Sequence, residues 1–396
     1  MAEPQDLHAV VAQSSRNKSS PVIRLFLCGD VMIGRGIDQM LGHPCDPALH
    51  EPHVRSAMDY VHLAEAVNGR LPRHVDPSYV WGAALDEWSR APPDGRLVNL
   101  ETSITRSNDY IAKGINYRVS PENAPCLAAA TIDCCTLANN HVLDWGRAGL
   151  AETLATLAHL RIKSAGAGLN CDEAAAPAVL DFHRKGRMLV FAFACPSSGV
   201  SQGWAATGEL PGINFLGDLS LAGVARIATA IERERQPGDV VVVSIHWGPN
   251  WGYHVPPAQQ RFARALIDDA GVSVVHGHSS HHAKGIEVYR DRLILYGCGD
   301  FLNDYEGIRG YEEYRDDLAL MYFAGIDAST ANLVCLEMVP LQIRNFQLAR
   351  PSRRDVVWLQ QILDRESRRF GSTVALDETG RLVVSAKPLG GVAGSS

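Results

Sequence analysis

The sequence lacks three features that would each indicate a particular class of protein. It has no pair of cysteines at CxxC spacing, no apolar run near the ~18 residues that a membrane helix needs, and no excess of basic residues. The net charge of −7 gives no electrostatic reason to expect nucleic acid or anionic lipid as a partner. The first 21 residues are polar and contain no apolar signal segment. We therefore expect a soluble, cytoplasmic protein that associates with a membrane only through partners.

Cysteines are present, but they show no disulfide pattern. There are nine, an odd number, and the adjacent Cys134 and Cys135 have poor geometry for a mutual bridge. Cys28, Cys195 and Cys298 lie in apolar runs, which indicates buried free thiols in a reducing compartment. A reactive cysteine is the alternative, although no evident activating base lies beside these thiols in the sequence.

The composition is that of an ordinary globular protein. Of 396 residues, 46% are hydrophobic and 20% are charged, so the chain can bury a full core. We divide it into a disordered N-terminal segment (1–21), a main domain (22–345), and a C-terminal helix with a loose tail (346–396). Residues 43–95 are rich in Pro, His and Trp and have weak periodicity, so we interpret them as an insertion with short helices.

Apolar runs and amphipathic segments alternate along the main domain. Strands are predicted at residues 22–28, 97–100, 133–138, 187–194, 239–245, 271–275, 286–290, 293–296, 318–324 and 333–341. Helices are predicted at residues 121–130, 149–160, 218–235 (capped by Asp218 or Ser220), 257–270 and 355–370. A tight turn at Asp291-Arg292 indicates a hairpin. This alternation predicts an α/β fold with central β-sheets flanked by helices.

Polar side chains suited to metal binding follow several of the predicted strands. They are Asp30, Glu101, Asn140-His141, His246 and the segment from His278 to His282. Ligands bind at strand ends in layered α/β folds, and this mixture of carboxylates, amide and imidazoles suits Zn, Mn, Fe or Co. Taken singly, a Gly-Asp turn or one histidine after a strand has an ordinary structural explanation. Four histidines within residues 276–282 are harder to explain by packing, and they favour ligation.

The order of these motifs resembles the CapA family of bacterial capsule-synthesis proteins. The similarity covers about residues 24 to 345 and includes the segments 29–35, 99–102, 139–144, 246–248, 277–281 and 297–301. Residues 278–282, 286–289 and 304–308 are similar to the subgroup named polyglutamine synthesis accessory proteins. The resemblance implies the layered calcineurin-like metallophosphoesterase fold.

The resemblance also implies a role for each motif residue. One or two divalent ions (Mn, Zn or Fe) are expected, with Asp30 and His281 at the first position, Glu101 bridging, and Asn140, His246 and His278 at the second. His141 would act as an acid or as an electrostatic stabiliser, and Asp144 would either orient it or cap the following helix. Independently of the resemblance, Arg35 follows the first strand and is expected to bind an anionic oxygen, the alternative being a surface arginine. Trp247 and Trp251 would line a groove or pack in the core.

Three departures from the general phosphoesterase pattern affect the first metal position. Met32 stands where phosphoesterases carry a ligand histidine, Glu101 replaces a shorter bridging aspartate, and the last motif is stretched to residues 277–281. A thioether is a poor ligand for harder divalent ions, so one tight metal or a loose pair is expected.

The function implied is production of a glutamate or glutamine polymer for the cell envelope. The protein would be a metal-dependent hydrolase or transferase acting on a phosphoester or glutamyl amide, with the polymer or a phosphorylated precursor as substrate. The alternative is a non-catalytic accessory protein that binds the polymer or its synthetase through the metal-site loops. A general phosphodiesterase is the third reading.

Overall fold

Two β-sheets form the centre of the computed structural model, which describes residues 20–386. The ten-stranded sheet has the order β19-β20-β17-β16-β1-β2-β5-β6, with β15 beside β1 and β18 beside β17. The six-stranded sheet has the order β13-β14-β12-β11-β9-β8. Around β1, the neighbours β2 and β15 are parallel and β16 is antiparallel. In the second sheet β9, β11, β12 and β14 are parallel. The predicted α/β class is confirmed.

The strands have the following bounds. The large sheet contains β1 Val22–Val31, β2 Gly95–Leu100, β5 Cys134–Thr136, β6 Lys163–Ala165, β15 Asp300–Leu302, β16 Leu318–Asp327, β17 Leu333–Arg344, β18 Gln347–Ala349, β19 Ser372–Leu376 and β20 Leu382–Ala386. The smaller sheet contains β8 Ala178–Asp181, β9 Arg187–Ala194, β11 Val240–His246, β12 Val274–His278, β13 Ile286–Tyr289 and β14 Arg292–Leu295. Short pairs join β3 Ser103–Ile104 with β4 Arg118–Val119, and β7 Ala167–Gly168 with β10 Gly212–Ile213.

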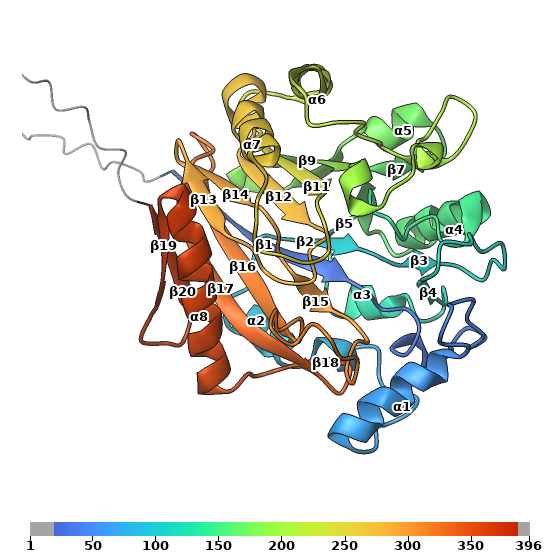
Figure 1. The fold of residues 1–396 in the computed structure, drawn as a ribbon. Helices are drawn as coiled ribbons and strands as arrows, with labels where there is room; N and C mark the ends of the chain where they lie inside the picture. The colour runs from blue at the N-terminus through green and yellow to red at the C-terminus, as the bar shows by residue number, and fades with distance from the viewer. Residues whose placement is uncertain (1–19, 387–396) are drawn as a thin grey trace, which may run out of the picture.

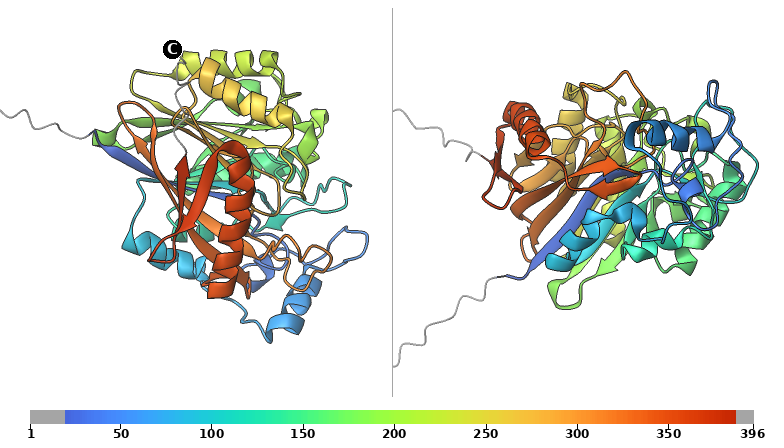
Figure 2. Two further views of the ribbon diagram at one scale, coloured as in Figure 1. Left: turned by 60° about the vertical axis from the view of Figure 1, so that its left-hand side comes forward. Right: turned by 90° about the horizontal axis from the view of Figure 1, so that it is seen from below.

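Helices cover the outer faces of the sheets. They are α1 Ala57–Asn68, α2 Ala83–Arg90, α3 Pro125–Ala129, α4 Gly146–His159, α5 Cys171–Ala175, α6 Leu221–Glu234, α7 Pro257–Ala270 and α8 Arg353–Ser367. The 3-10 helices are η1 Asp38–Met40, η2 Tyr79–Trp81, η3 His183–Lys185, η4 Pro196–Ser198, η5 Gln202–Trp204 and η6 Arg368–Phe370. Helices α6 and α7 lie over β9, β11 and β12 (Figure 1), and α8 runs alongside β19 and β20 (Figure 2). In residues 20–386 no helix is long and apolar enough to cross a membrane.

Alternate side chains of β11 pack into two different hydrophobic cores. Val240 and Val242 pack in the core between the sheets, whereas Val241 and Val243 pack against α6 and α7. A strand that is buried on both faces has no polar alternation, which explains its continuous apolar run. The parallel pairs β1–β2 and β11–β12 end on the same side, where Asp30, Glu101, His246 and His278 lie close together, and the candidate site lies there.

Several predicted boundaries shift in the structure. The helix predicted at 121–130 is reduced to α3, because residues 121–124 form a turn before Pro125. Ser220, rather than Asp218, caps α6 by accepting a hydrogen bond from the Gly223 N–H. The hairpin turn lies at Arg290-Asp291, one residue earlier than predicted, and both residues have positive φ. The short helices expected in the insertion are α1 and α2.

The C-terminal segment contains more structure than a helix. The predicted helix is present as α8 and η6. The strands β18, β19 and β20, which were not predicted, also join the large sheet. The loose tail predicted after Pro388 and most of the predicted disordered segment 1–21 lie outside the described residues. All nine cysteines are described and free; seven are buried, including Cys28, Cys195 and Cys298, as predicted. Burial raises the pKa of these three thiols, which disfavours the reactive thiolate.

Candidate metal centre

Three predicted ligands come together between the two sheets. Asp30 lies in β1, and His246 and His278 end the neighbouring strands β11 and β12, where they are directly paired in the parallel register. One ligand atom from each of the three lies within 4.8 Å of the others, and all three side chains are buried. His246 Nδ1 is 2.7 Å from His278 Nδ1, which in turn is 3.7 Å from Asp30 Oδ1.

Glu101 and Asn140 lie beside this cluster, as predicted. The Asn140 Oδ1 atom is 2.9 Å from His246 Nε2, and Glu101 Oε1 is 3.9 Å from the same nitrogen. Asp30 lies near the end of β1, and Glu101 directly follows the last residue of β2. The two strands are parallel neighbours, so their carboxyl ends lie side by side. Five of the six predicted ligands therefore lie together, four of them buried and Asn140 half-buried.

The backbone around Asp30 is held by a close crossing of two strands. A Cβ atom at Gly29 would meet the Gly299 carbonyl oxygen at 1.7 Å, so only glycine allows β1 and the start of β15 to approach this closely. This approach sets Asp30 opposite Asp300 in the parallel register. Asn99 Nδ2 donates to Asp30 Oδ1 at 2.7 Å, and the Ser279 N–H donates to Oδ2 at 3.1 Å, so the carboxylate has a fixed orientation.

Burial of several acids in one place strongly perturbs their pKa values. Burial, together with the nearby Asp300, raises the pKa of Asp30 to about 7. Burial and the adjacent Asp30 raise the pKa of Glu101 well above its ordinary value. Burial likewise lowers the pKa of His246 and His278, so both imidazoles are neutral near pH 7. The cluster therefore combines crowded carboxyl groups with neutral imidazoles.

This donor set fits a divalent cation. Within residues 20–386, Glu101 Oε2 is buried and has no hydrogen-bond partner, which is costly for a carboxylate oxygen. A cation bound between Asp30, Glu101 and the two imidazoles would compensate the crowded negative charge and the orphaned oxygen. Nitrogen and oxygen donors of this kind are ligands of transition metals such as Mn, Zn and Fe.

His141 lies at the edge of the cluster with one ring nitrogen fixed. Its Nδ1 is 2.7 Å from Asp144 Oδ2, and its Nε2 is 3.6 Å from Glu101 Oε1. Asp144 also accepts the Tyr117 N–H at 2.6 Å and lies 2.8 Å from Lys113 Nζ. Trp145, not Asp144, is the N-cap residue of α4, so the contacts favour the orienting role for Asp144. Burial lowers the pKa of His141 to about 4.

His281 is held by different partners. Its Nδ1 is 3.0 Å from Asp300 Oδ1, its Nε2 is 3.0 Å from Asn250 Nδ2, and Asp300 also accepts a hydrogen bond from Asn303. The three-residue cluster combines Asp30 with His246 and His278, whereas the sequence analysis had divided these residues between two positions. Although burial opposes it, the Asp300 carboxylate raises the pKa of His281.

Arg35 is a buried ion-pair residue. Its guanidinium donates to both oxygens of Asp304 and to Glu51 Oε1 at 3.0 Å, and it lies 3.7 Å from the centre of the Tyr60 ring. The side chain is 1% exposed, which is incompatible with the surface-arginine alternative. Because Nε, Nη1 and Nη2 are all engaged, the contacts favour a structural role over binding of a substrate anion.

The two tryptophans predicted as groove walls differ in environment. Trp247 is buried against Tyr296 and donates its indole N–H to the Tyr296 carbonyl, so it packs in the core. Trp251 stacks on Tyr311 with ring centres 4.0 Å apart, and its ring centre is 5.1 Å from that of His281. Trp251 therefore belongs to an aromatic wall beside the site.

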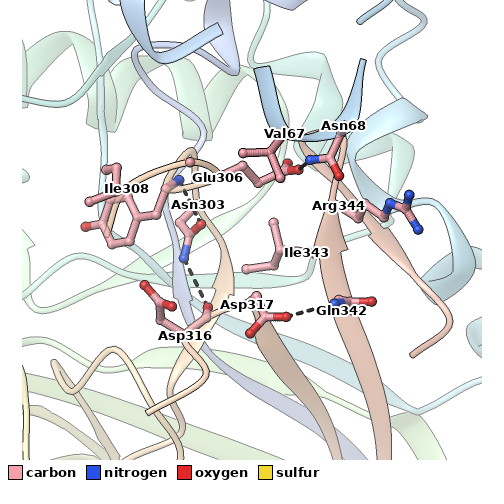
Figure 3. Close-up of a pocket in the computed structure, with 12 residues that line it drawn as sticks. Val67, Asn68, Asn303, Glu306, Ile308, Asp316, Asp317, Gln342, Ile343 and Arg344 are labelled. Carbon is pink, nitrogen blue, oxygen red and sulfur yellow. Dashed lines mark hydrogen bonds between the residues drawn. The ribbon is translucent and has the colours of Figure 1, made fainter. Parts of the chain in front are cut away.

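A cavity of about 290 Å³ opens behind Asp300. Asn303 connects the two, because its amide donates to Asp300 Oδ2. The same amide donates to the main-chain oxygen of Asp316, a contact that is dashed in Figure 3. Burial and the nearby Asp300 raise the pKa of Asp316 to about 7. Glu306 and Asp317, which also line the cavity, are both satisfied by hydrogen bonds.

Four residues near the site were not predicted to act there. Asp300 was noted only as part of a motif, although a Gly-Asp after an apolar run is the same signal that identified Asp30. Asn99 and Ser244 lie inside strands, where a lone polar residue between apolar neighbours was the available signal. Lys113 lies in a polar loop without periodicity, and no pattern could have identified it.

The chain is similar in sequence to a family of bacterial proteins and to several known relatives. The family described as "Bacterial capsule synthesis protein PGA_cap" matches residues 24–305. A probable polyglutamine synthesis accessory protein of Mycobacterium tuberculosis is 45% identical over 89% of this chain and 93% of its own length. The capsule biosynthesis protein CapA of Bacillus anthracis is 25% identical over 83% of this chain and 69% of its own. The PGA biosynthesis protein CapA of Bacillus subtilis is 27% identical over 57% and 56%, respectively.

The family match covers most of the described residues, including Asp30, Glu101, His246 and His278. The fold is accordingly the metallophosphoesterase-like α/β fold that the motif order implied. From the family match and from the 45% identity across nearly the full length of the mycobacterial relative, it follows that the chain belongs to the bacterial capsule synthesis protein PGA_cap family.

Proposed function

We propose that the chain is a metal-dependent hydrolase or transferase in the synthesis of a glutamate or glutamine polymer of the cell envelope. The names of its relatives supply the polymer context. The observation that carries the chemistry is the buried cluster of Asp30, His246 and His278 beside the orphaned Glu101 Oε2. The bond acted on is a glutamyl amide or a phosphoester, and the partners are the polymer, its precursor and synthetase components.

The proposed ligands are Asp30, Glu101, Asn140, His246 and His278 for one divalent ion, with His281 available to a second. A bound divalent cation supplies a lowered water pKa and polarises a carbonyl or phosphoryl oxygen. Asn99 and Ser279 keep the Asp30 carboxylate directed at the ion by donating to both of its oxygens. Mn, Zn or Fe suits this set of donors.

His141 is the proposed proton carrier. Asp144 holds its Nδ1, so its Nε2 faces Glu101 and the space that a substrate would occupy. Hydrogen bonding to a carboxylate fixes the tautomer and stabilises the protonated imidazole when it forms. Lys113 lies 3.2 Å from His141 Nδ1 and partly offsets the Asp144 charge, which favours the neutral ring between proton transfers.

A non-catalytic accessory protein is the second candidate, and a specific observation favours it. Met32 occupies the ligand-histidine position and contacts only the Tyr305 hydroxyl among polar groups of the described residues, while His281 is paired with Asp300. The first metal position therefore has few available ligands. A single ion could then bind polymer carboxylates without turnover.

Metal content and turnover together test the proposal. Protein purified without chelators should retain about one equivalent of Mn, Zn or Fe, because the two buried imidazoles are neutral at neutral pH and the ion would compensate the charge of the crowded carboxylates. It should then hydrolyse or transfer a poly-γ-glutamate or glutamyl phosphoester substrate. Binding of the polymer without turnover would favour the accessory function, and metal below about a tenth of an equivalent would refute the site.

Variants of single ligands give a second measurement. Under identical dialysis, His246→Ala and Asp30→Ala should both lose metal, because the two residues are proposed ligands of the same ion. Met32→His should raise the metal content by adding an imidazole for a second ion. Wild-type metal content in either alanine variant would contradict the assignment of ligands.

A further inference from the structure

A chain of buried polar groups connects His278 to the backbone of β1. Ser244 and His276 are paired across β11 and β12, and both are fully buried. Ser244 Oγ lies 2.8 Å from His278 Nε2 and 3.0 Å from His276 Nδ1, and His276 Nε2 lies 2.7 Å from the Cys28 carbonyl oxygen. The chain therefore crosses the core between the two sheets and ends two residues before Asp30.

The hydrogens in this chain can be placed by elimination. A carbonyl oxygen can only accept, so His276 Nε2 carries the hydrogen that it donates to Cys28. A fully buried imidazole whose partners are a carbonyl and a hydroxyl has no charge to compensate a proton, so it is neutral and its Nδ1 accepts. The Ser244 hydroxyl must donate to that nitrogen, and its oxygen then accepts from His278 Nε2–H. The further contact of Ser244 Oγ with Thr136 Oγ1, at 3.4 Å, is the longest of the set.

We propose that Ser244 and His276 are positioning residues that fix His278 as the Nε2–H tautomer and leave its Nδ1 lone pair for the metal ion. The inference rests on the proposed function, since it concerns the ligand atom of that site. The Nδ1 atom is the one that faces Asp30 and His246. The tautomer of a ligating histidine is usually fixed by a direct hydrogen bond to a carboxylate or carbonyl. Here the Cys28 carbonyl fixes the tautomer of His276, and Ser244 links that imidazole to His278.

The surroundings argue against a purely structural role. Their neighbours in the same layer of the core are apolar, including Val242 and Val274. A pair of apolar residues of similar volume would satisfy the packing without any hydrogen-bond requirement. Apart from the 3.4 Å contact of Ser244 with Thr136, the two polar side chains have their clear physical consequence at the end of the chain, where His278 is held.

The test measures Mn²⁺ affinity by electron paramagnetic resonance and the His278 tautomer by long-range ¹H–¹⁵N correlation in the metal-free protein. Ser244→Ala should weaken Mn²⁺ binding by about 10–100-fold and abolish the single Nε2–H form. His276→Phe, which keeps a ring in the core, should do the same. Ser244→Thr retains the hydroxyl and should restore both readouts.

Ser273→Ala is the matched control. Ser273 is also fully buried beside β11, where its Oγ accepts the Val241 N–H, but it does not touch the chain that ends at His278. It should change stability without changing Mn²⁺ affinity or the tautomer. The inference is overturned if Ser244→Ala and His276→Phe both bind Mn²⁺ within about twofold of the wild type, or if metal-free His278 is an Nδ1–H tautomer. Wild type that binds no metal yet shows the Nε2–H tautomer would instead refute the proposed function.

Discussion

The ionisation of Asp30 should make the stability of the protein depend on pH. Its pKa is about 7 in the folded protein and 3.8 in an unperturbed chain, so between about pH 4 and 7 the folded state holds a proton that the unfolded state has lost. This group therefore lowers the stability of the metal-free protein as pH rises toward 7, and between pH 6.5 and 8 its remaining contribution is a fall of about 1 kcal/mol. The histidines whose pKa values are lowered from 6.5 contribute an opposing rise as the unfolded chain loses its protons, so the effect of Asp30 is the difference between the wild type and Asp30→Asn.

Thermal unfolding of the metal-free protein at pH 6.5, 7 and 8 measures this effect. Saturating Mn²⁺ should raise the melting temperature more at pH 8 than at pH 6.5, because the ion binds the deprotonated carboxylate. Asp30→Asn should remove this fall, so between pH 6.5 and 8 its stability should fall less, or rise more, than that of the wild type; the contribution of Asp316, whose pKa is also raised to about 7, remains in both proteins. An Asp30→Asn variant with the full wild-type slope would contradict the assignment.

A substitution of His141 should distinguish metal binding from catalysis. His141→Ala should retain the wild-type metal content, because its ring nitrogens face Asp144 and Glu101 rather than the cluster, and it should lose turnover by at least about 100-fold. Metal analysis and a turnover assay on the same preparation provide both readouts. His254→Ala, at an exposed position, is the control and should change neither. Loss of metal in His141→Ala would identify this histidine as a ligand.

A site residue could be assigned from the sequence when its own strand placed it, but not when its role depended on partners far away in the chain. Asp30, Glu101, His246 and His278 end or follow buried strands, so their convergence follows from strand patterning alone. The engagement of Arg35 was not predictable, because Asp304 lies 269 residues away and Glu51 belongs to the insertion. The pairing of His281 with Asp300 depends on β15, a three-residue strand that has too few residues to show a pattern.

At the scale of elements, the length and burial of a segment decided whether it was predicted. The apolar runs of β9 and β11 are buried on both faces, and their predicted bounds agree with the structure to within one residue. The strands β19 and β20 are five residues long and partly exposed, so their composition resembles that of a loop. They become strands because β17 offers an unpaired edge and α8 covers β19, and neither is visible locally.

The packing of α8 can be tested directly. Leu363 is fully buried on the inner face of this helix, so Leu363→Ala should lower the free energy of unfolding by about 2–5 kcal/mol. Leu221, which is 75% exposed at the start of α6, is the matched control, and Leu221→Ala should change stability by less than about 0.5 kcal/mol. Denaturant unfolding of the three proteins provides the comparison. A Leu363→Ala cost as small as the control would show that α8 adds little to the core.

For the whole molecule, net charge makes a prediction about the proposed polymer. The chain carries −7 and polyglutamate is a polyanion, so at long range protein and polymer repel each other, and only the bound cation attracts carboxylates locally. Salt screens the repulsion as the Debye length falls from about 30 Å at 0.01 M to about 8 Å at 0.15 M. In Mn²⁺, polyglutamate affinity measured by fluorescence anisotropy should therefore increase over this range of NaCl and disappear with a chelator. An uncharged polyglutamine oligomer should show no such salt dependence. Affinity that decreases steadily with NaCl would instead indicate a basic polymer-binding surface, and the metal cluster would then have to act on a different substrate.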